Sequence, residues 1–356
     1  MTIAVTNAVT NAVTNAMNGA IVCFGELLIR LSAPGRTLLM QTPSLDLHVG
    51  GAEANVAIGL ARLGHRAAMV SVVPSNALGQ GALAAVRSHG VDTSRVIVRD
   101  GRMGLYFLSP GAGLRASEIV YDRAHSSFAT APADAFDWPA LLAGAGRLHL
   151  SGITPALGPV AARAALAAAQ AATALGVPVS FDGNYRARLW EAWDSDPRAI
   201  LGSLVGHADI LFGNHQDVAL LLGREFGGDG ADRRRAAADA AFEAFPRLQL
   251  IASTARHTED ADRHRIAARI DTRDAHVQTP EVLVSGIVDR IGAGDAFAAG
   301  VLHGLSQGAG DGRDIGHAAR IGLALACLKH SLPGDASLFG QGDIDAFLAG
   351  GLDVRR

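Results

Sequence analysis

The chain contains almost no lysine: Lys329 is the only one among 356 residues, so arginine carries nearly all of the positive charge. A P-loop of the form GxxxxGK[ST] needs a lysine directly after its glycine-rich turn, and this chain has none in such a place. Schiff-base chemistry could depend only on Lys329. If the protein handles ATP, it does so without the lysine of a P-loop.

Cysteines and long apolar runs are also scarce. The two cysteines, Cys23 and Cys327, are too few for a disulfide framework, and their apolar surroundings predict buried free thiols in a reduced cytoplasm. No apolar run reaches the roughly 18 residues of a membrane span. A net charge of −3 argues against a nucleic-acid surface. Because 49% of the residues are hydrophobic, the chain can bury a large core.

The first residues form a short repeat. The segment AVTNAVTNAVTNAM repeats the unit VTNA, which has no helical period and no hydrophobic face to bury. No basic segment precedes an apolar core, so we expect no signal peptide. We expect residues 1–18 to be a disordered tail. We also hypothesise that Met17 is the true start, which an intact-mass measurement of the native protein would decide.

The rest of the chain alternates between strands and helices. Short apolar runs predict strands at 21–26, 67–73, 177–182, 208–214 and 248–253, and helices are expected at 50–64, 293–307 and 314–328. This alternation predicts a doubly wound, mostly parallel α/β sheet flanked by helices, in a single domain over 19–350. Two stretches near 27–48 and 96–123 contain only short β-rich pieces, which predict a small β-sheet lid.

The segment DRIGAGDAF, residues 289–297, combines glycines with the start of a helix. Glycines allow the backbone to approach a ligand closely, and the unpaired N–H groups of a helix start bind anions. A carboxylate at Asp295 would accept a proton from a hydroxyl that attacks a bound phosphate. The alternative is a glycine-rich turn in which Asp295 only caps its helix.

Two motifs together resemble those of a known family. GGAEANVAIGLARLG, residues 50–64, and DRIGAGDAFAAG, residues 289–300, resemble the two signatures of the ribokinase-like (PfkB) sugar kinases, and the resemblance covers about residues 20–345. It implies ATP and Mg²⁺ as cofactors, a monovalent cation near Asp289 and a homodimer formed through the lid. It also implies that Asp295 is the catalytic base and that the amides of Gly292, Ala293 and Gly294 hold the γ-phosphate.

Four further stretches are similar to the 2-keto-3-deoxygluconate kinases: residues 104–126, 181–190, 212–217 and 328–337. The similarity implies that the sugar acid is contacted by Gly51, Asn55, Tyr106, Tyr121, Arg123, Arg186 and Asp335. It implies a nucleotide site near Asn184, Asn214, Ser253 and His330, with Asp217 placing Mg²⁺ through water. One stretch departs from the family: residues 253–264 lack the glycines usual in the nucleotide loop.

The chemistry of a sugar acid independently favours arginines. Its carboxylate needs a partner when it is buried, and the forked guanidinium of arginine provides two donors. Arg123 and Arg186 could also be ordinary surface arginines, Asn214 a helix cap, His330 a residue at a helix end, and the two tyrosines parts of a β surface. Glu26 could face the sugar, or it could be a solvated or capping residue.

Three other functions compete with a sugar-acid kinase. The first is a kinase for a neutral sugar or a nucleoside. The second is a dinucleotide-dependent oxidoreductase, which needs GxGxxG after the first strand, where this chain has GELLIRL. The third is a sugar-binding regulator without activity, which the presence of Asp295 argues against.

Overall fold

The computed structural model describes residues 19–307 and 314–350. The expected tail over residues 1–18 and the proposed start at Met17 therefore lie outside the described residues. Among the helices that the structure describes, none has both the length and the apolar character needed to cross a bilayer.

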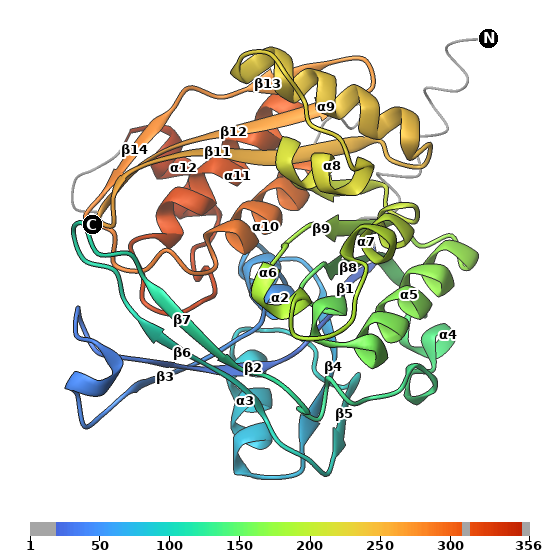
Figure 1. The fold of residues 1–356 in the computed structure, drawn as a ribbon, viewed down its shortest axis with the longest axis vertical. Coiled ribbons are helices and arrows are strands. Elements are labelled where there is room, and N and C mark those ends of the chain that lie inside the picture. Colours follow the sequence, from blue (N-terminus) through green and yellow to red (C-terminus); the bar gives the residue numbers. More distant parts are fainter. Residues whose placement is uncertain (1–18, 308–313, 351–356) are drawn as a thin grey trace.

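A ten-stranded sheet forms the centre of the molecule (Figure 1). Its strands lie in the order β13 (His276–Gln278), β12 (Arg263–Thr272), β11 (Leu250–Asp260), β10 (Ile210–Phe212), β9 (Val179–Asp182), β8 (Ala145–Ser151), β1 (Ala20–Phe24), β4 (Ala67–Pro74) and β5 (Val96–Arg99), and β14 (Val282–Ser285) pairs with β12. All pairings from β11 to β5 are parallel, whereas β12 runs antiparallel to β11. Parallel strands require crossover helices, and the predicted alternation is confirmed.

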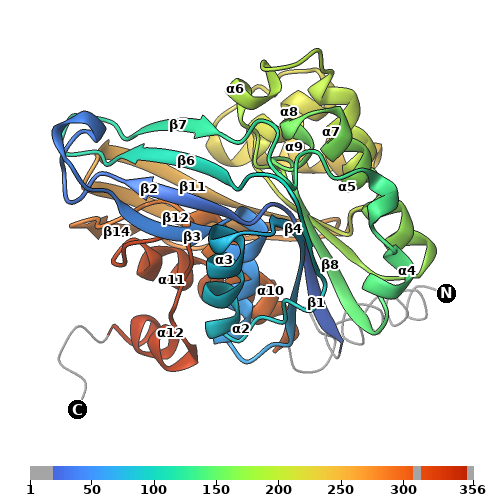
Figure 2. The same ribbon diagram turned by 90° about the horizontal axis from the view of Figure 1, so that it is seen from below.

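Helices cover both faces of this sheet (Figure 2). One face packs against α2 (Ala52–Arg62), α3 (Ala77–Ser88), α10 (Ala293–Ser306), α11 (Ile315–Lys329) and α12 (Gln341–Leu348). The other packs against α4 (Trp138–Leu141), α5 (Pro159–Ala174), α6 (Ala187–Trp190), α7 (Pro197–Val205), α8 (His215–Leu222) and α9 (Gly230–Ala244). Short 3₁₀ turns lie at Leu39–Gln41, Ala133–Ala135 and Pro155–Leu157. Cys23 and Cys327 are buried free thiols, as predicted.

A separate four-stranded sheet stands beside the main body. Its order is β3 (Asp46–Gly50), β2 (Leu28–Ser32), β6 (Gly104–Ser109) and β7 (Glu118–Asp122), and Figure 2 shows it extending away from the helical layers. The lid piece predicted near 96–123 begins too early in the sequence, since β6, the first of its strands in the lid, begins at Gly104. Residues 96–99 form β5 and pair in parallel with β4 at the edge of the large sheet. Helix α3 connects the two strands, which makes them an ordinary βαβ unit.

Candidate active site

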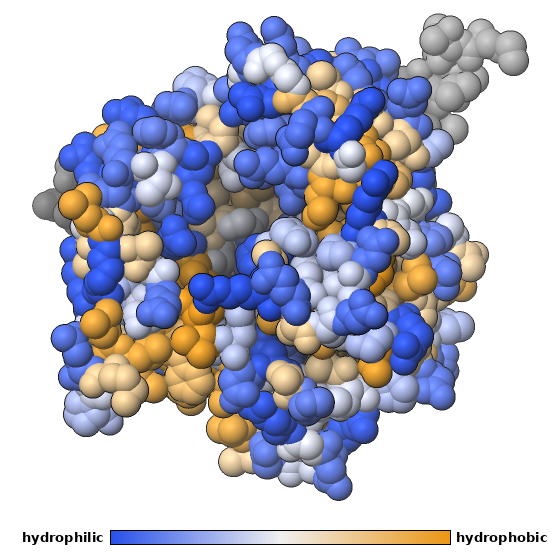
Figure 3. All heavy atoms as spheres, in the orientation of Figure 1, coloured by the Kyte–Doolittle hydropathy of each residue, from blue (hydrophilic) through white to orange (hydrophobic). Residues whose placement is uncertain are grey.

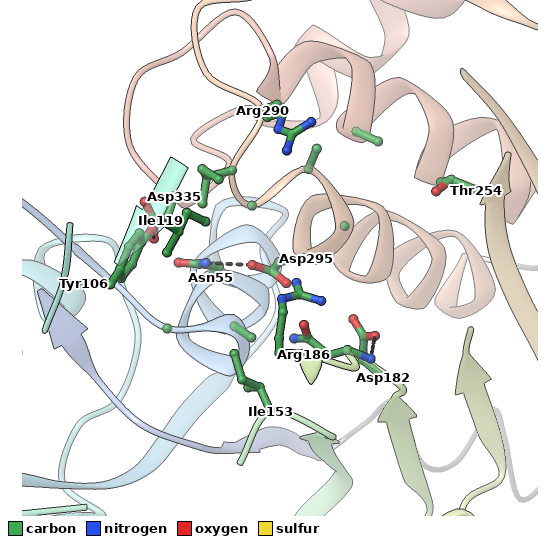
Figure 4. A pocket seen from close by; sticks show the side chains of 18 of the residues that line it. Asn55, Tyr106, Ile119, Ile153, Asp182, Arg186, Thr254, Arg290, Asp295 and Asp335 are labelled. Atoms are coloured by element: carbon green, nitrogen blue, oxygen red, sulfur yellow. Dashed lines mark hydrogen bonds between the residues drawn. The ribbon is translucent and has the colours of Figure 1, made fainter. Parts of the chain in front are cut away.

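A cavity of about 670 Å³ lies where the lid meets the carboxyl ends of the central strands. Figure 3 shows the molecule hollowed in this region, and Figure 4 shows side chains from the lid, α2 and α10 converging there. The predicted residues that line it are Gly51, Asn55, Tyr106, Tyr121, Arg123, Asn184, Arg186, Asn214, Gly292, Ala293, Gly294, Asp295, His330 and Asp335. Ligands of open α/β sheets bind at this end of the strands, so the fold and the motifs agree.

Asp295 lies in the first turn of α10 and is held by the neighbouring helix. Asn55 of α2 donates its side-chain N–H to Asp295 Oδ2 at 2.7 Å, a contact drawn in Figure 4. Burial raises the pKa of Asp295 to about 7, and the charge of Glu53 adds to this rise, although the bond from Asn55 opposes it. The carboxylate is therefore oriented and is more basic than an exposed aspartate, as proton abstraction near neutral pH requires.

The glycines before Asp295 bring bare backbone to the cavity. Gly292 is the N-cap of α10 with φ of 78°, and no side chain caps this helix. A Cβ at Gly292 would lie 1.6 Å from the carbonyl oxygen of Asp335, whereas one at Gly294 would meet nothing within 4 Å. The helix start thus has no side-chain cap and has open space beside Gly294, which suits an anion. Asp295 does not cap its helix, contrary to the alternative interpretation.

The lid contributes two tyrosines that face each other across β6 and β7. Tyr106 pairs with Tyr121 in the register of these strands, and their ring centroids are 6.4 Å apart. The Tyr106 hydroxyl donates to Asp335 Oδ2 at 2.6 Å. Burial raises the pKa of Asp335, although the charge of Arg30 opposes this rise. Asp335 thus joins the lid to the turn after α11.

The two predicted arginines line the cavity in different ways. Arg123 is buried, and its Nε donates to Glu26 Oε2 at 2.6 Å. Ser126 also donates its hydroxyl to Glu26, so this carboxylate is a buried partner of Arg123 rather than a solvated residue. Arg186 is exposed just before α6, and no ion pair of the described residues includes it. Arg186 therefore has more free charge for an anionic ligand than Arg123.

Asn214 and Asp217 form the cap of α8. Asn214 Oδ1 accepts from the Gln216 N–H at 2.7 Å, and Asp217 Oδ2 accepts from the Asn214 N–H at 2.7 Å. The capping interpretation of Asn214 is correct, and the residue also lines the cavity. Asp217 does not line it, because its carboxylate turns back onto the backbone of its own helix start. Among the described residues, no three His, Cys, Asp or Glu side chains converge as a metal site.

Asn184 and His330, two of the residues predicted at the nucleotide site, line the cavity. Asn184 lines the cavity in a left-handed conformation, with φ of 37°. His330 also lines it, and its Nδ1 contacts the carbonyl oxygen of Ala326 at 2.7 Å. Burial lowers the pKa of His330 to about 4, so the ring is neutral at pH 7. His330 thus presents an uncharged ring to the cavity.

The glycine-free stretch 253–264 is not a loop. It contains most of β11, the turn after it and the first two residues of β12, and this extended backbone needs no glycine. Side chains alternate along a strand, and Thr254 and Arg256 line the cavity while Ser253 does not. Ser253 therefore lies on a strand rather than in the predicted loop, and its neighbour Thr254 is the residue that lines the cavity.

Several cavity residues were missed by the sequence analysis. Arg256 and Arg290 line the cavity and add positive charge to it. Asp182, at the end of β9, also lines it, and burial raises the pKa of Asp182 to about 7 with a further contribution from Asp295. Arg290 stands inside the DRIGAGD motif, so its position could have drawn attention. Arg256 could be found only once the strand register was known.

Comparisons with known proteins agree over nearly the whole chain. The sequence model described as pfkB family carbohydrate kinase matches residues 18–338. The 2-dehydro-3-deoxygalactonokinase of Haloferax volcanii is 32% identical over 93% of this chain and 97% of its own. The crystal structure of a 2-dehydro-3-deoxygluconokinase from Thermotoga maritima is 35% identical and covers 93% of this chain and 98% of its own, with a TM-score of 0.87. The crystal structure of a PfkB family carbohydrate kinase from Listeria grayi is 36% identical and covers 93% of this chain and 99% of its own, with a TM-score of 0.84.

Proposed function

Because the chain belongs to the pfkB family of carbohydrate kinases, we propose that it transfers a phosphoryl group from ATP to a primary hydroxyl of a keto sugar acid. We propose 2-keto-3-deoxygluconate as the substrate, with the 6-phosphate as product. The observation that carries this proposal is the placement of Asp295 in one cavity with an open helix start and the arginines Arg123 and Arg186. The names of the relatives in Haloferax and Thermotoga support the substrate class.

Asp295 acts as the general base in this reaction. Its raised pKa suits it to accept the proton of the substrate hydroxyl as that oxygen attacks phosphorus. The bond from Asn55 fixes one carboxylate oxygen and leaves the other for the substrate. The N–H groups at Ala293 and Gly294 stabilise the negative charge that spreads over the phosphoryl oxygens.

The sugar lies between the lid and α2. Arg186 and Arg123 bind the carboxylate of the sugar acid, which fixes the hydroxyl that reaches Asp295. Gly51, Asn55 and Tyr121 line the same part of the cavity and contact the hydroxyls of the sugar. Closure of the lid excludes water, which would otherwise compete as the nucleophile.

The nucleotide lies on the side of Asn184, Asn214, Thr254 and His330. Gly294 lines the cavity and an added Cβ there would meet nothing within 4 Å, so the space beside it is suited to a phosphate. Asp182 and Asn214 are the side chains suited to the water shell of Mg²⁺, since Asp217 does not line the cavity. When bound, Mg²⁺ neutralises part of the phosphate charge.

Ligand-dependent thermal unfolding tests the substrate class without a turnover assay. At a ligand concentration of about 100 times Kd, binding stabilises the folded state by roughly 2.7 kcal/mol. We expect 2-keto-3-deoxygluconate to raise Tm by this mechanism, and ribose, fructose and adenosine to leave it unchanged. Protection by a neutral sugar or a nucleoside, without protection by the sugar acid, would favour the alternative kinase.

We also propose that two copies of the chain pair through their lids. Apolar side chains gather over the lid at the lower left of Figure 3. Met40, in the turn between β2 and β3, is 96% exposed, and Leu47 on the edge strand β3 is 55% exposed. Val120 on the other edge strand, β7, is also exposed. Pairing would remove this apolar surface and the strand edges from water.

A further inference from the structure

The single lysine of the chain is buried beside the phosphate-binding turn. Lys329 ends α11, and its side chain is 0% exposed. Its ammonium donates to the carbonyl oxygen of Asp289 at 3.2 Å and to that of Leu332 at 3.1 Å. These carbonyls belong to two different loops, one leading into α10 and the other following α11. The ammonium therefore joins two loops through main-chain oxygens, the kind of ligand that also binds metal cations.

Asp289 has every oxygen engaged by a donor. Its Oδ1 accepts from the Ile291 N–H at 2.9 Å. Its Oδ2 accepts from Arg30 Nη2 at 2.6 Å and from the Gly334 N–H at 3.1 Å, and its carbonyl oxygen accepts from Lys329. A metal cation here would compete with donors that Asp289 already has, two of which are the charged groups of Arg30 and Lys329. The residues around Asp289 thus do not fit the monovalent cation that the family resemblance implies.

The charges of this cluster also balance without a metal. Arg30 lies between two carboxylates: its Nη2 pairs with Asp289, and its Nη1 is 3.0 Å from Asp335 Oδ1. Lys329 interacts electrostatically with the same two carboxylates. Two cations therefore already face these two carboxylates in a buried setting, and the charge of Asp295 also acts on Lys329. A metal cation placed here would be buried beside the positive charges of Arg30 and Lys329 and would be repelled by both, which is unfavourable.

The cluster adjoins the proposed phosphate site. Asp289 lies three residues before Gly292, and Gly292 packs so closely on Asp335 that a Cβ would lie 1.6 Å from the Asp335 carbonyl oxygen. The loop held by Lys329 thus continues directly into the amides at 293 and 294. A shift of either loop would change the positions of these amides.

We propose that the Lys329 ammonium is a built-in monovalent cation, which positions the phosphate-binding amides and makes the kinase independent of added potassium. The proposal rests on the proposed kinase function for its effect on turnover. Lys329 is a positioning residue: it acts through the loops of Asp289 and Leu332 and lies outside the cavity lining.

The first test uses the unaltered protein. Turnover and Tm are measured in a buffer prepared without potassium, to which the chloride of K⁺, Na⁺, NH₄⁺ or tetramethylammonium is added in turn at one ionic strength. We expect the same kcat and the same Tm with all four salts. Activation or stabilisation by K⁺ relative to tetramethylammonium would overturn the proposal.

The second test removes the ammonium in Lys329→Met, which keeps the length of the side chain. Loss of charge-assisted bonds of about 1.5–3 kcal/mol predicts a fall in kcat of roughly 10–100-fold, with little change in KM for the sugar. We expect K⁺, NH₄⁺ or methylammonium to restore part of kcat and to raise the Tm of the variant, and tetramethylammonium to do neither. A folded variant whose kcat and Tm respond to none of these cations would overturn the proposal.

Arg269→Met is the matched control. Arg269 is a buried cation on β12 and is paired with Asp271 at 2.7 Å, but it does not line the cavity. We expect its loss to lower Tm without creating a response to monovalent cations. If no sugar acid is turned over, the proposed function fails, but the Tm measurements still decide the role of Lys329. If Lys329→Met does not fold, the salt series on the unaltered protein decides it.

Discussion

At the scale of single residues, the ionised Asp295 carboxylate that would act as the base also lowers the stability of the folded protein. Burial raises its folded pKa from the ordinary value of 3.8 to about 7, so the folded state holds the proton more tightly than the unfolded chain. The stability gained from this proton is complete at low pH and is lost as pH rises through about 7. The ionised base that catalysis needs is therefore the less stable form of the fold.

Asp295→Asn should remove the general base and also the loss of folding stability that accompanies its ionisation. We expect turnover to fall by about 10²–10⁴-fold, since general base catalysis contributes that much, with substrate binding retained. Tm should rise relative to the unaltered protein, and by more at pH 8 than at pH 5. Steady-state kinetics and thermal unfolding at the two pH values check both points. Near-normal turnover would refute the role of Asp295 as the base.

The pH dependence of turnover should report the same carboxylate. Activity should rise as pH increases through about 7, because Asp295 must lose its proton to act. The bond donated by Asn55 stabilises the ionised form, so Asn55→Ala should raise the pKa and move this rise to higher pH. A profile of kcat against pH measures the shift. A shift to lower pH would contradict the assignment.

We expect Arg186 to lower KM for acidic sugars and to have no effect on KM for neutral sugars. Because a charge-assisted bond contributes about 1.5–3 kcal/mol, Arg186→Ala should raise KM for a sugar acid roughly 10–100-fold and leave that for fructose unchanged. Arg188→Ala is the control, since Arg188 is an exposed arginine of α6 that does not line the cavity. Equal effects of Arg186→Ala on both sugars would point to another substrate. Arg123 is a poorer test, because its removal leaves Glu26 buried without its partner.

At the scale of elements, two glycines of α10 act differently: one borders the cavity and the other lies where α10 packs on α11. At its start, Gly294 opens the backbone to the cavity. Further along, a Cβ at Gly300 would lie 2.8 Å from Gly322 Cα, so this glycine lets α10 pack closely on α11. The first glycine serves ligand binding and the second serves helix packing.

Alanine at these two positions should therefore have opposite effects. Gly294→Ala should keep or raise Tm, because alanine favours a helix by about 1 kcal/mol over glycine, while turnover falls and KM for ATP rises. Gly300→Ala should lower Tm because of the collision with α11. Thermal unfolding and kinetics of the two variants separate these effects. A loss of Tm in Gly294→Ala, with normal kinetics, would contradict the anion-binding role of the helix start.

The part of the site that sequence predicts is the part held by local motifs. DRIGAGDAF predicted the glycines and Asp295, since all of these act within one turn and the start of one helix. The position of Ser253 on a strand, outside the cavity lining, was not predicted, because the register of β11 depends on its pairing with β12. The pairing of Arg123 with Glu26 joins residues 97 positions apart, and no local pattern encodes it. The contacts of Asp289 likewise come from distant parts of the chain, namely β2 and the end of α11 with the turn after it.

At the scale of the whole molecule, the lid has an active-site face and an outer apolar surface. Tyr106 and Tyr121 line the cavity, while Met40 and Leu47 are exposed to solvent. Tyr106 and Arg30 lie opposite each other on β6 and β2, and both contact Asp335 in the main body. The lid is therefore connected to the loops that adjoin the phosphate site.

The proposed pairing of lids predicts a dimer that a single charge disrupts. Leu47→Asp should give a monomer, because it places a carboxylate within the apolar surface of the edge strand. Leu175→Asp is the control, since Leu175 is 49% exposed at the end of α5, away from the lid. Sedimentation velocity measures both variants. A monomeric unaltered protein, or a Leu47→Asp variant that stays dimeric, would contradict the pairing.

The most direct test of the proposed function is a coupled ADP-release assay over a small panel of substrates. The panel contains 2-keto-3-deoxygluconate, 2-keto-3-deoxygalactonate, fructose, ribose and adenosine, each with the unaltered protein and with Asp295→Asn. We predict that kcat/KM is highest for a keto sugar acid, by at least the roughly 10–100-fold that one arginine contributes, and that Asp295→Asn lowers this activity by about 10²–10⁴-fold. A higher kcat/KM for fructose, ribose or adenosine would contradict the account.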